Sequence, residues 1–188
     1  MKKIMFNDLY GLTQAVIEGR KTMTRRIVPT KTRLRRALAV IHDEPHGSEQ
    51  EEYLKSACYK VGEIVAVAQD YSSFYNILDN TRQIPEGAGW NNKMFVRADL
   101  MPHQIRITGI KCERLQDISD ADCLKEGVYS DYGDTDFPPR EFYDYGGNTD
   151  NGFDTPRKAF ASLIDKVSGK GTWASNPWVV AYEFELVK

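Results

Sequence analysis

The 188-residue sequence has no apolar run close to the roughly 20 residues that a membrane-spanning helix needs. Its mean hydropathy is −0.52, so we expect no membrane segment. An apolar stretch is also missing after Lys2 and Lys3, because Asn7 and Asp8 interrupt it. A secretion signal needs such a stretch, and the sequence therefore predicts a cytoplasmic protein.

Cysteine and histidine are scarce. The three cysteines are scattered without a CxxC pair, which argues against a disulfide framework and a zinc site. The three histidines are too dispersed to form a ligand set: they are His42, His46 and His103. We therefore expect no metal, and no residue pattern indicates another cofactor.

The remaining composition is that of a folded protein. Hydrophobic residues make up 41% of the chain and charged residues 28%, enough to build a core and too apolar for bulk disorder. The length favours one domain over residues 1–188.

Charge is distributed unevenly along the chain. Residues 1–42 hold ten lysines and arginines against two acids, a net charge of +8. Residues 116–154 hold eleven acids against Lys125 and Arg140, a net charge of −9. The basic stretch indicates an anionic partner, with phosphate the commonest candidate. The alternative, of equal weight from sequence alone, is that the two stretches neutralise each other in the fold.

The apolar pattern predicts an α+β fold. Strands are expected at residues 4–6, 64–68, 104–114 and 178–186, and a further short strand between a turn near Gly19 and Pro29. Helices are expected before Gly19, at residues 31–39, after Ser119 and from Thr155 to Gly169. Regular helical crossovers between the strands are missing, which favours a small mixed β-barrel flanked by short helices over a doubly wound sheet.

Two stretches are expected as insertions into this fold. Residues 69–93 show no clear periodicity, and residues 129–153 are acidic and aromatic and predict a surface loop. Residues 47–52 are also expected as a loop, and residues 173–177 as a turn.

The polar segment at residues 19–26 carries candidate chemistry. Lys21 and Thr24 share a face in a helical turn, and Thr24 and Arg26 share a face in a strand. A turn that becomes a strand therefore directs all three side chains into one cleft. Together they supply a cation or base, a hydroxyl and a planar fork for an anion. Spacing alone favours the alternative, a solvated basic turn.

The same segment resembles the GxKxxTxR signature of the ASCH domain, a branch of the PUA-like β-barrels. Three other blocks resemble the family in the expected order: residues 61–65, 107–119 and 176–184. The resemblance covers most of the chain except residues 69–93 and 129–153. It implies a PUA-like mixed barrel, closest to longer bacterial and phage-type members, whose basic cleft contacts RNA, a nucleotide or a nucleoside.

The resemblance also implies a site. A small bacterial member of the family is an amidohydrolase that deacetylates N4-acetylcytidine with a lysine, a threonine and a glutamate, which correspond here to Lys21, Thr24 and Glu126. Lys21 would activate Thr24, and Glu126 would activate water to clear the acyl-enzyme. Further ligand contacts are expected from Arg20, Arg25, Arg26 and Trp173, with Arg26 at the oxyanion or another anionic group. The small member has an apolar residue in place of Arg25.

Three functions follow from these observations. The first is a module that binds RNA or a nucleotide through the basic stretch. The second is an amidohydrolase acting on an acylated nucleoside, and the third a ribonuclease, which ranks last because no histidine pair supports it. The position of Glu126 separates the first two. A convergence of Glu126 with Lys21 and Thr24 favours the enzyme, whereas a Glu126 directed to solvent, the surface-residue alternative, leaves only binding.

Overall fold

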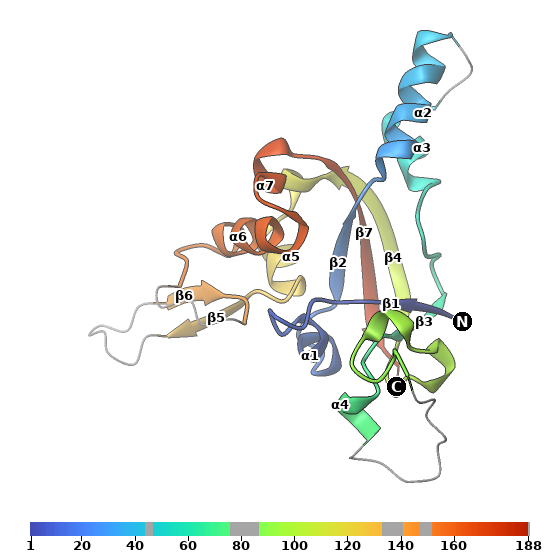
Figure 1. The fold of residues 1–188 in the computed structure, drawn as a ribbon. Helices are drawn as coiled ribbons and strands as arrows, with labels where there is room; N and C mark the ends of the chain where they lie inside the picture. The colour runs from blue at the N-terminus through green and yellow to red at the C-terminus, as the bar shows by residue number, and fades with distance from the viewer. Residues whose placement is uncertain (44–46, 76–86, 133–140, 147–151, 188) are drawn as a thin grey trace.

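The computed structural model describes residues 1–43, 47–75, 87–132, 141–146 and 152–187. Its main sheet has the order β1–β3–β4–β7–β2, with bounds Lys2–Ile4, Ile64–Val67, Gln104–Arg114, Trp178–Leu186 and Met23–Ile27 (Figure 1). The β1–β3 pair is parallel and the other pairs are antiparallel. A second sheet pairs β5 (Tyr129–Tyr132) with β6 (Glu141–Asp144). The predicted α+β class is confirmed.

The main sheet is open. Its order has β1 at one end and β2 at the other, and within the described residues these two strands do not pair. These strands therefore do not form a closed barrel, and the finer assignment to a PUA-like fold stays a prediction. The chain leaving β1 nevertheless approaches β2, because the Arg26 guanidinium donates to the Met5 carbonyl across 2.6 Å.

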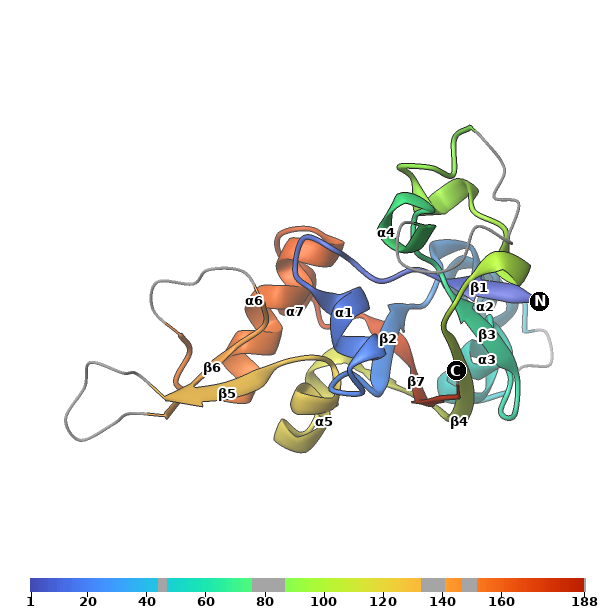
Figure 2. The ribbon, with the colours of Figure 1, turned by 90° about the horizontal axis from the view of Figure 1, so that it is seen from below.

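Helices flank the sheet. They are α1 (Leu12–Ile17), α2 (Thr30–Ile41), α3 (Glu49–Leu54), α4 (Ser72–Tyr75), α5 (Asp120–Lys125), α6 (Pro156–Ser168) and α7 (Thr172–Ser175). Short 3₁₀ turns occupy η1 (Lys93–Phe95), η2 (Ala98–Leu100) and η3 (Leu115–Asp117). In Figures 1 and 2, α5, α6 and the β5–β6 pair lie together on one side of the molecule, away from β1 and β3.

Capping residues fix two helices where the sequence predicts them. The Ser119 hydroxyl accepts a hydrogen bond from the Asp122 N–H and begins α5. The Thr155 hydroxyl accepts from the Lys158 N–H, and Pro156 occupies the first position of α6. Both caps satisfy N–H groups that have no partner within the helix. The α5 cap places Glu126 immediately after the last helical residue.

Three sequence predictions of irregular structure are wrong. The expected loop at residues 47–52 contains the start of α3, where Ser48 and Glu51 form a capping box. The expected turn at residues 173–177 contains most of α7. The expected surface loop at residues 129–153 contains the paired strands β5 and β6, and the rest of that stretch falls partly outside the described residues.

Two apolar cores form because β3 alternates between faces. Val65 and Val67 enter the main core with β4, β7, α1 and α6, whereas Ala66 and Ala68 face a smaller core. The described part of the predicted 69–93 insertion supplies Tyr71 and Phe74 to that smaller core. The insertion therefore covers the second face of β3, with residues 76–86 outside the described set.

Candidate functional site

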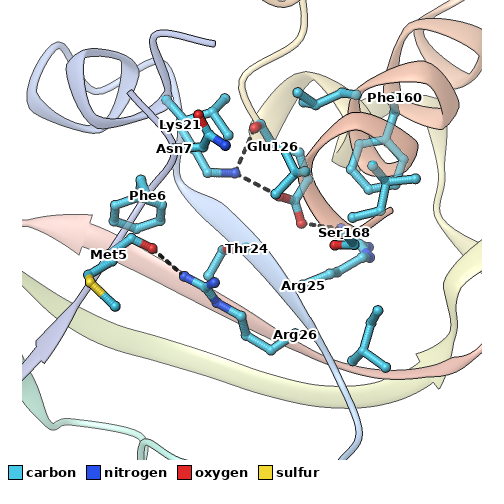
Figure 3. Close-up of a pocket in the computed structure, with 15 residues that line it drawn as sticks. Met5, Phe6, Asn7, Lys21, Thr24, Arg25, Arg26, Glu126, Phe160 and Ser168 are labelled. Atoms are coloured by element: carbon cyan, nitrogen blue, oxygen red, sulfur yellow. Dashed lines mark hydrogen bonds and ion pairs between the residues drawn. The ribbon is translucent and has the colours of Figure 1, made fainter. Parts of the chain in front are cut away.

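A cavity of about 280 Å³ lies between β2, the chain leaving β1, and α6 (Figure 3). Its polar wall is built from Lys21, Thr24, Arg25, Arg26 and Glu126. Its apolar wall is built from Phe6, Leu12, Ile27, Phe160, Leu163, Ile164 and Val167. An apolar cavity with a few convergent polar groups is the usual form of a small-molecule site.

The turn and strand at residues 19–27 aim three side chains at this cavity. Lys21 lies in the turn between α1 and β2, where its N–H donates to the Ala15 carbonyl at 2.8 Å. Thr24 and Arg26 follow on β2, two residues apart and therefore on one face of the strand. The structure confirms the predicted turn and strand, and Figure 3 shows the three side chains around one hollow.

Lys21 and Glu126 form a buried ion pair although 105 residues separate them. The Lys21 Nζ donates to Glu126 Oε2 and to the Glu126 carbonyl, both at 2.6 Å. The two residues are 2% and 4% exposed. The alternative of a surface Glu126 is wrong. Burial lowers the pKa of the Lys21 amine from its ordinary value, and the Glu126 carboxylate opposes that shift.

Thr24 is the hydroxyl of the site. It is 5% exposed and lines the cavity with the ion pair. Its hydroxyl makes no hydrogen bond to any described residue, so the hydroxyl keeps its donor and acceptor capacity for a ligand. The Lys21 amine donates to Glu126 in this structure and not to Thr24.

Arg25 is the first of the expected ligand contacts that the structure reassigns. Its side chain is 1% exposed and its guanidinium contacts three carboxylates: Glu113 at 2.7 Å, Glu126 at 3.0 Å and Asp122 at 3.1 Å. Burial lowers its pKa, but Glu126 and Glu113 together outweigh this and hold the pKa above its ordinary value. Arg25 lines the cavity, but its main contact there is with the Glu126 carboxylate, which it holds in place.

Glu113, Asp122 and Lys111 complete this cluster, and sequence reasoning missed them. Lys111 donates to Asp122 at 2.8 Å and pairs with Glu113 at 3.2 Å. Asp122 is buried, which raises its pKa, but Lys111 and Arg25 outweigh this and lower it. Spacing was the signal that could have found them, because Lys111 and Glu113 share a strand face and Asp122 and Glu126 share a helix face. With Lys21 and Arg25, the cluster has three cations and three carboxylates.

Arg26 is the exposed cation of the cavity. Its guanidinium donates to the Met5 carbonyl at 2.6 Å and lies 6.0 Å from the centre of the Phe6 ring. Among the described residues, no carboxylate lies within 4 Å of it. Its place in the lining matches the sequence expectation, and its contact with an anionic group stays a prediction.

The structure does not bring Arg20 or Trp173 to this cavity. Arg20 pairs with Glu18 at 2.5 Å on the surface. The Trp173 ring packs edge-on against Phe160, with Arg157 over its face at 5.6 Å. Trp173 therefore packs on α6 and does not line this cavity, and its expected ligand contact stays a prediction.

The described part of the chain shows neither a metal-binding cluster nor a membrane-spanning helix. There, no three histidine, cysteine or acidic side chains stand close enough to hold a metal ion, and His46 lies outside the described residues. None of the described helices has the length and apolar character needed to cross a bilayer.

Comparisons with known proteins add little. No protein-family model and no curated protein matches the sequence. Among solved structures, a protein from Enterococcus faecalis described by the family model DUF984 aligns with a TM-score of 0.35 and 13% identity. The alignment covers 94% of this chain and 66% of that protein. A likeness at this level carries no family and no activity to this chain.

Proposed function

We propose that this protein is an amidohydrolase that removes the acyl group from a modified nucleoside such as N4-acetylcytidine, and that it is a divergent member of the ASCH branch of PUA-like proteins. The observation that carries the proposal is the burial of Lys21, Thr24 and Glu126 around one cavity. The ASCH-like motif at residues 19–26 supports it. The site is also too small for a duplex, since its volume is at the lower end of the roughly 300–1,000 Å³ of ligand pockets.

The proposed reaction has two steps. In the first, the Thr24 hydroxyl attacks the amide carbonyl while its proton passes to the neutral amine of Lys21. The C–N bond then breaks, and Lys21 returns the proton to the departing exocyclic nitrogen of the cytosine. In the second step, water attacks the Thr24 ester, Glu126 takes the water proton, and acetate leaves with the Thr24 oxygen reprotonated.

Other residues of the cavity support both steps. The lowered pKa of Lys21 favours the neutral amine that the first step needs. Arg25 and Lys21 each donate to a different oxygen of Glu126, which fixes the carboxylate and leaves it lone pairs for water. Arg26 lies where it can donate to the oxyanion or to another anionic group of the substrate.

RNA binding is a second candidate function, and one observation favours it. Helix α2 carries four cations and no acid (Lys31, Arg33, Arg35 and Arg36), and none of its residues is buried. The other basic residues of the N-terminal stretch argue less for it, because Lys21 and Arg25 are neutralised inside the cluster and Lys2 pairs with Glu63. Binding through α2 would weaken steeply as salt rises, because phosphate contacts release counterions.

The test is direct incubation of the purified protein with N4-acetylcytidine. We expect stoichiometric release of cytidine and acetate, a rate reduced at least about a hundredfold by Thr24→Val, and partial activity in Thr24→Ser. Valine keeps the shape of threonine without the hydroxyl, so the pair isolates the nucleophile. A wild-type protein that leaves N4-acetylcytidine and other acylated nucleosides intact contradicts the proposal.

A further inference from the structure

A second cavity, of about 430 Å³, lies beside the first and has no role in the proposed reaction. It is lined by residues that include Tyr10, Arg20, Tyr129, Tyr145 and Gly146. Two of its other lining positions are Ala15 of α1 and Gly127, which directly follows Glu126. Tyr129 begins β5, and Tyr145 and Gly146 follow β6, so this cavity depends on the stretch that the ASCH-like blocks do not cover.

The walls of this cavity are aromatic rings and small residues. Tyr145 is buried, its hydroxyl is hydrogen-bonded to Ser162 at 2.9 Å, and its ring meets Tyr10 edge-on at 6.0 Å. Gly146 has a φ of +73°, and a Cβ there would lie 2.9 Å from the Tyr10 carbonyl oxygen. The backbones therefore approach closely, and three tyrosines line the cavity, of which Tyr145 is already stacked on Phe153 at 5.9 Å. Tyrosine faces stack with planar aromatic ligands, including every nucleobase.

One cation, Arg20, lines this cavity, whereas a second, Lys166, contacts two of the rings without lining the cavity. The Arg20 guanidinium is 5.9 Å from the Tyr129 ring centre, and the Lys166 amine is 5.2 Å from the Tyr145 ring centre and 5.8 Å from that of Tyr10. Arg20 is held by Glu18 in an exposed ion pair, which is a weak interaction that a phosphate can replace. No carboxylate of the described residues lies within 4 Å of the Lys166 amine. An anionic group in this cavity would therefore meet the Arg20 guanidinium.

We propose that this second cavity binds a nucleoside monophosphate, with the base stacked on Tyr129 and Tyr10 and the phosphate at Arg20. The site is separate from the cavity of Lys21 and Glu126, so the proposal goes beyond the proposed function. It accounts for the Arg20 ligand contact that the sequence predicts and that the first cavity does not use. It also gives the β5–β6 pair a role.

Calorimetric titration of the full chain with CMP, AMP, cytidine and inorganic phosphate tests the proposal. We expect each monophosphate to bind more tightly than cytidine or phosphate alone. Tyr129→Ala should weaken the binding of the monophosphates about tenfold or more, and Tyr129→Phe should leave it within about twofold. Arg20→Ala should weaken the binding of CMP and AMP but not of cytidine. Tyr132→Ala, which removes an exposed tyrosine from the same strand, is the matched control and should change nothing.

Three results overturn the proposal: no binding of either monophosphate at millimolar concentration, equal losses in Tyr129→Ala and Tyr132→Ala, or loss of binding in Arg26→Ala, which would place the ligand in the first cavity. Near-ultraviolet circular dichroism of each variant verifies that the fold is intact. The outcome is independent of the hydrolysis assay, because neither Tyr129 nor Arg20 lines the cavity proposed for the reaction.

Discussion

Replacement of Arg25 with alanine is expected to lower the free energy of unfolding by about 3–5 kcal/mol. The guanidinium is the shared partner of Glu113, Asp122 and Glu126, and its removal leaves these carboxylates with Lys21, Lys111 and the half-exposed Lys125. A buried charge without a partner has lost its hydration, and no electrostatic attraction compensates for that loss. Urea unfolding of the purified variant measures the effect. Hydrolysis of N4-acetylcytidine should fall as well, because the Glu126 carboxylate is no longer held from both sides.

Arg106→Ala is the matched control for this prediction. Arg106 contacts Glu185 at 3.1 Å, but both side chains are about half exposed. We expect a loss of no more than about 1 kcal/mol, as for most exposed ion pairs. Where Arg25→Ala does not fold, Arg25→Lys keeps the charge, loses the planar fork and should show an intermediate loss. Equal small losses in Arg25→Ala and Arg106→Ala would show that the buried cluster does not support the fold.

Replacement of Lys21 with methionine is expected to lower the rate of N4-acetylcytidine hydrolysis by about 10²–10⁴-fold, the usual contribution of a general base. Methionine keeps a similar length and apolar stem, so the cavity is kept while the amine is removed. Steady-state kinetics of acetate release measures the change. Lys55→Met is the control, because Lys55 also contacts a glutamate at 2.6 Å but lies on the surface. A Lys21→Met protein with wild-type activity would remove lysine from the mechanism.

The pH dependence of the hydrolysis rate tests the role of Lys21 independently. The neutral amine is the base, and it is populated above the pKa of Lys21. Because burial lowers that pKa from the ordinary 10.5, the rate should rise with pH along a limb that begins below this value. The residual activity of Lys21→Met should lack the limb. A wild-type rate that falls as the pH rises from about 6 to about 9 would contradict the assignment of Lys21 as the general base.

Local signals in the sequence predicted a large part of the fold. The strands at residues 104–114 and 178–186 have the predicted bounds, because each combines β-branched residues with clear ends. Ser119 and Thr155 marked helix starts through chemistry that acts within three residues. The capping box at Ser48 was an equally local signal, and the loop prediction overlooked it. The pairing of β5 with β6 was harder to see, because acidic residues conceal its alternation.

The site was predictable only where its residues are adjacent in the sequence. Thr24 and Arg26 face the cavity because strand alternation places them together. The resemblance to the ASCH family pointed to Lys21 and Thr24 through the motif at residues 19–26, and to Glu126 through the helix entry at residues 115–119. The role of Arg25 depends on Glu113 and Glu126, which are 88 and 101 residues away. They meet Arg25 only because β7 pairs with both β2 and β4 and because α5 packs against β2. Spacing along the chain carries no such information. The failure of the two end strands, β1 and β2, to pair with each other within the described residues is likewise a result of tertiary packing.

Detection of an acyl-enzyme tests most directly whether Thr24 is the nucleophile that acts with Lys21 and Glu126. The protein is mixed with excess N4-acetylcytidine, quenched in acid within the first turnovers, and digested for mass spectrometry. We expect one acetyl group on the peptide that contains Thr24. This acetyl group should persist longer in Glu126→Gln and be absent in Thr24→Val. Release of acetate at the wild-type rate from Thr24→Val, or a quenched wild-type protein with its acetyl group on another residue, would contradict this role of Thr24.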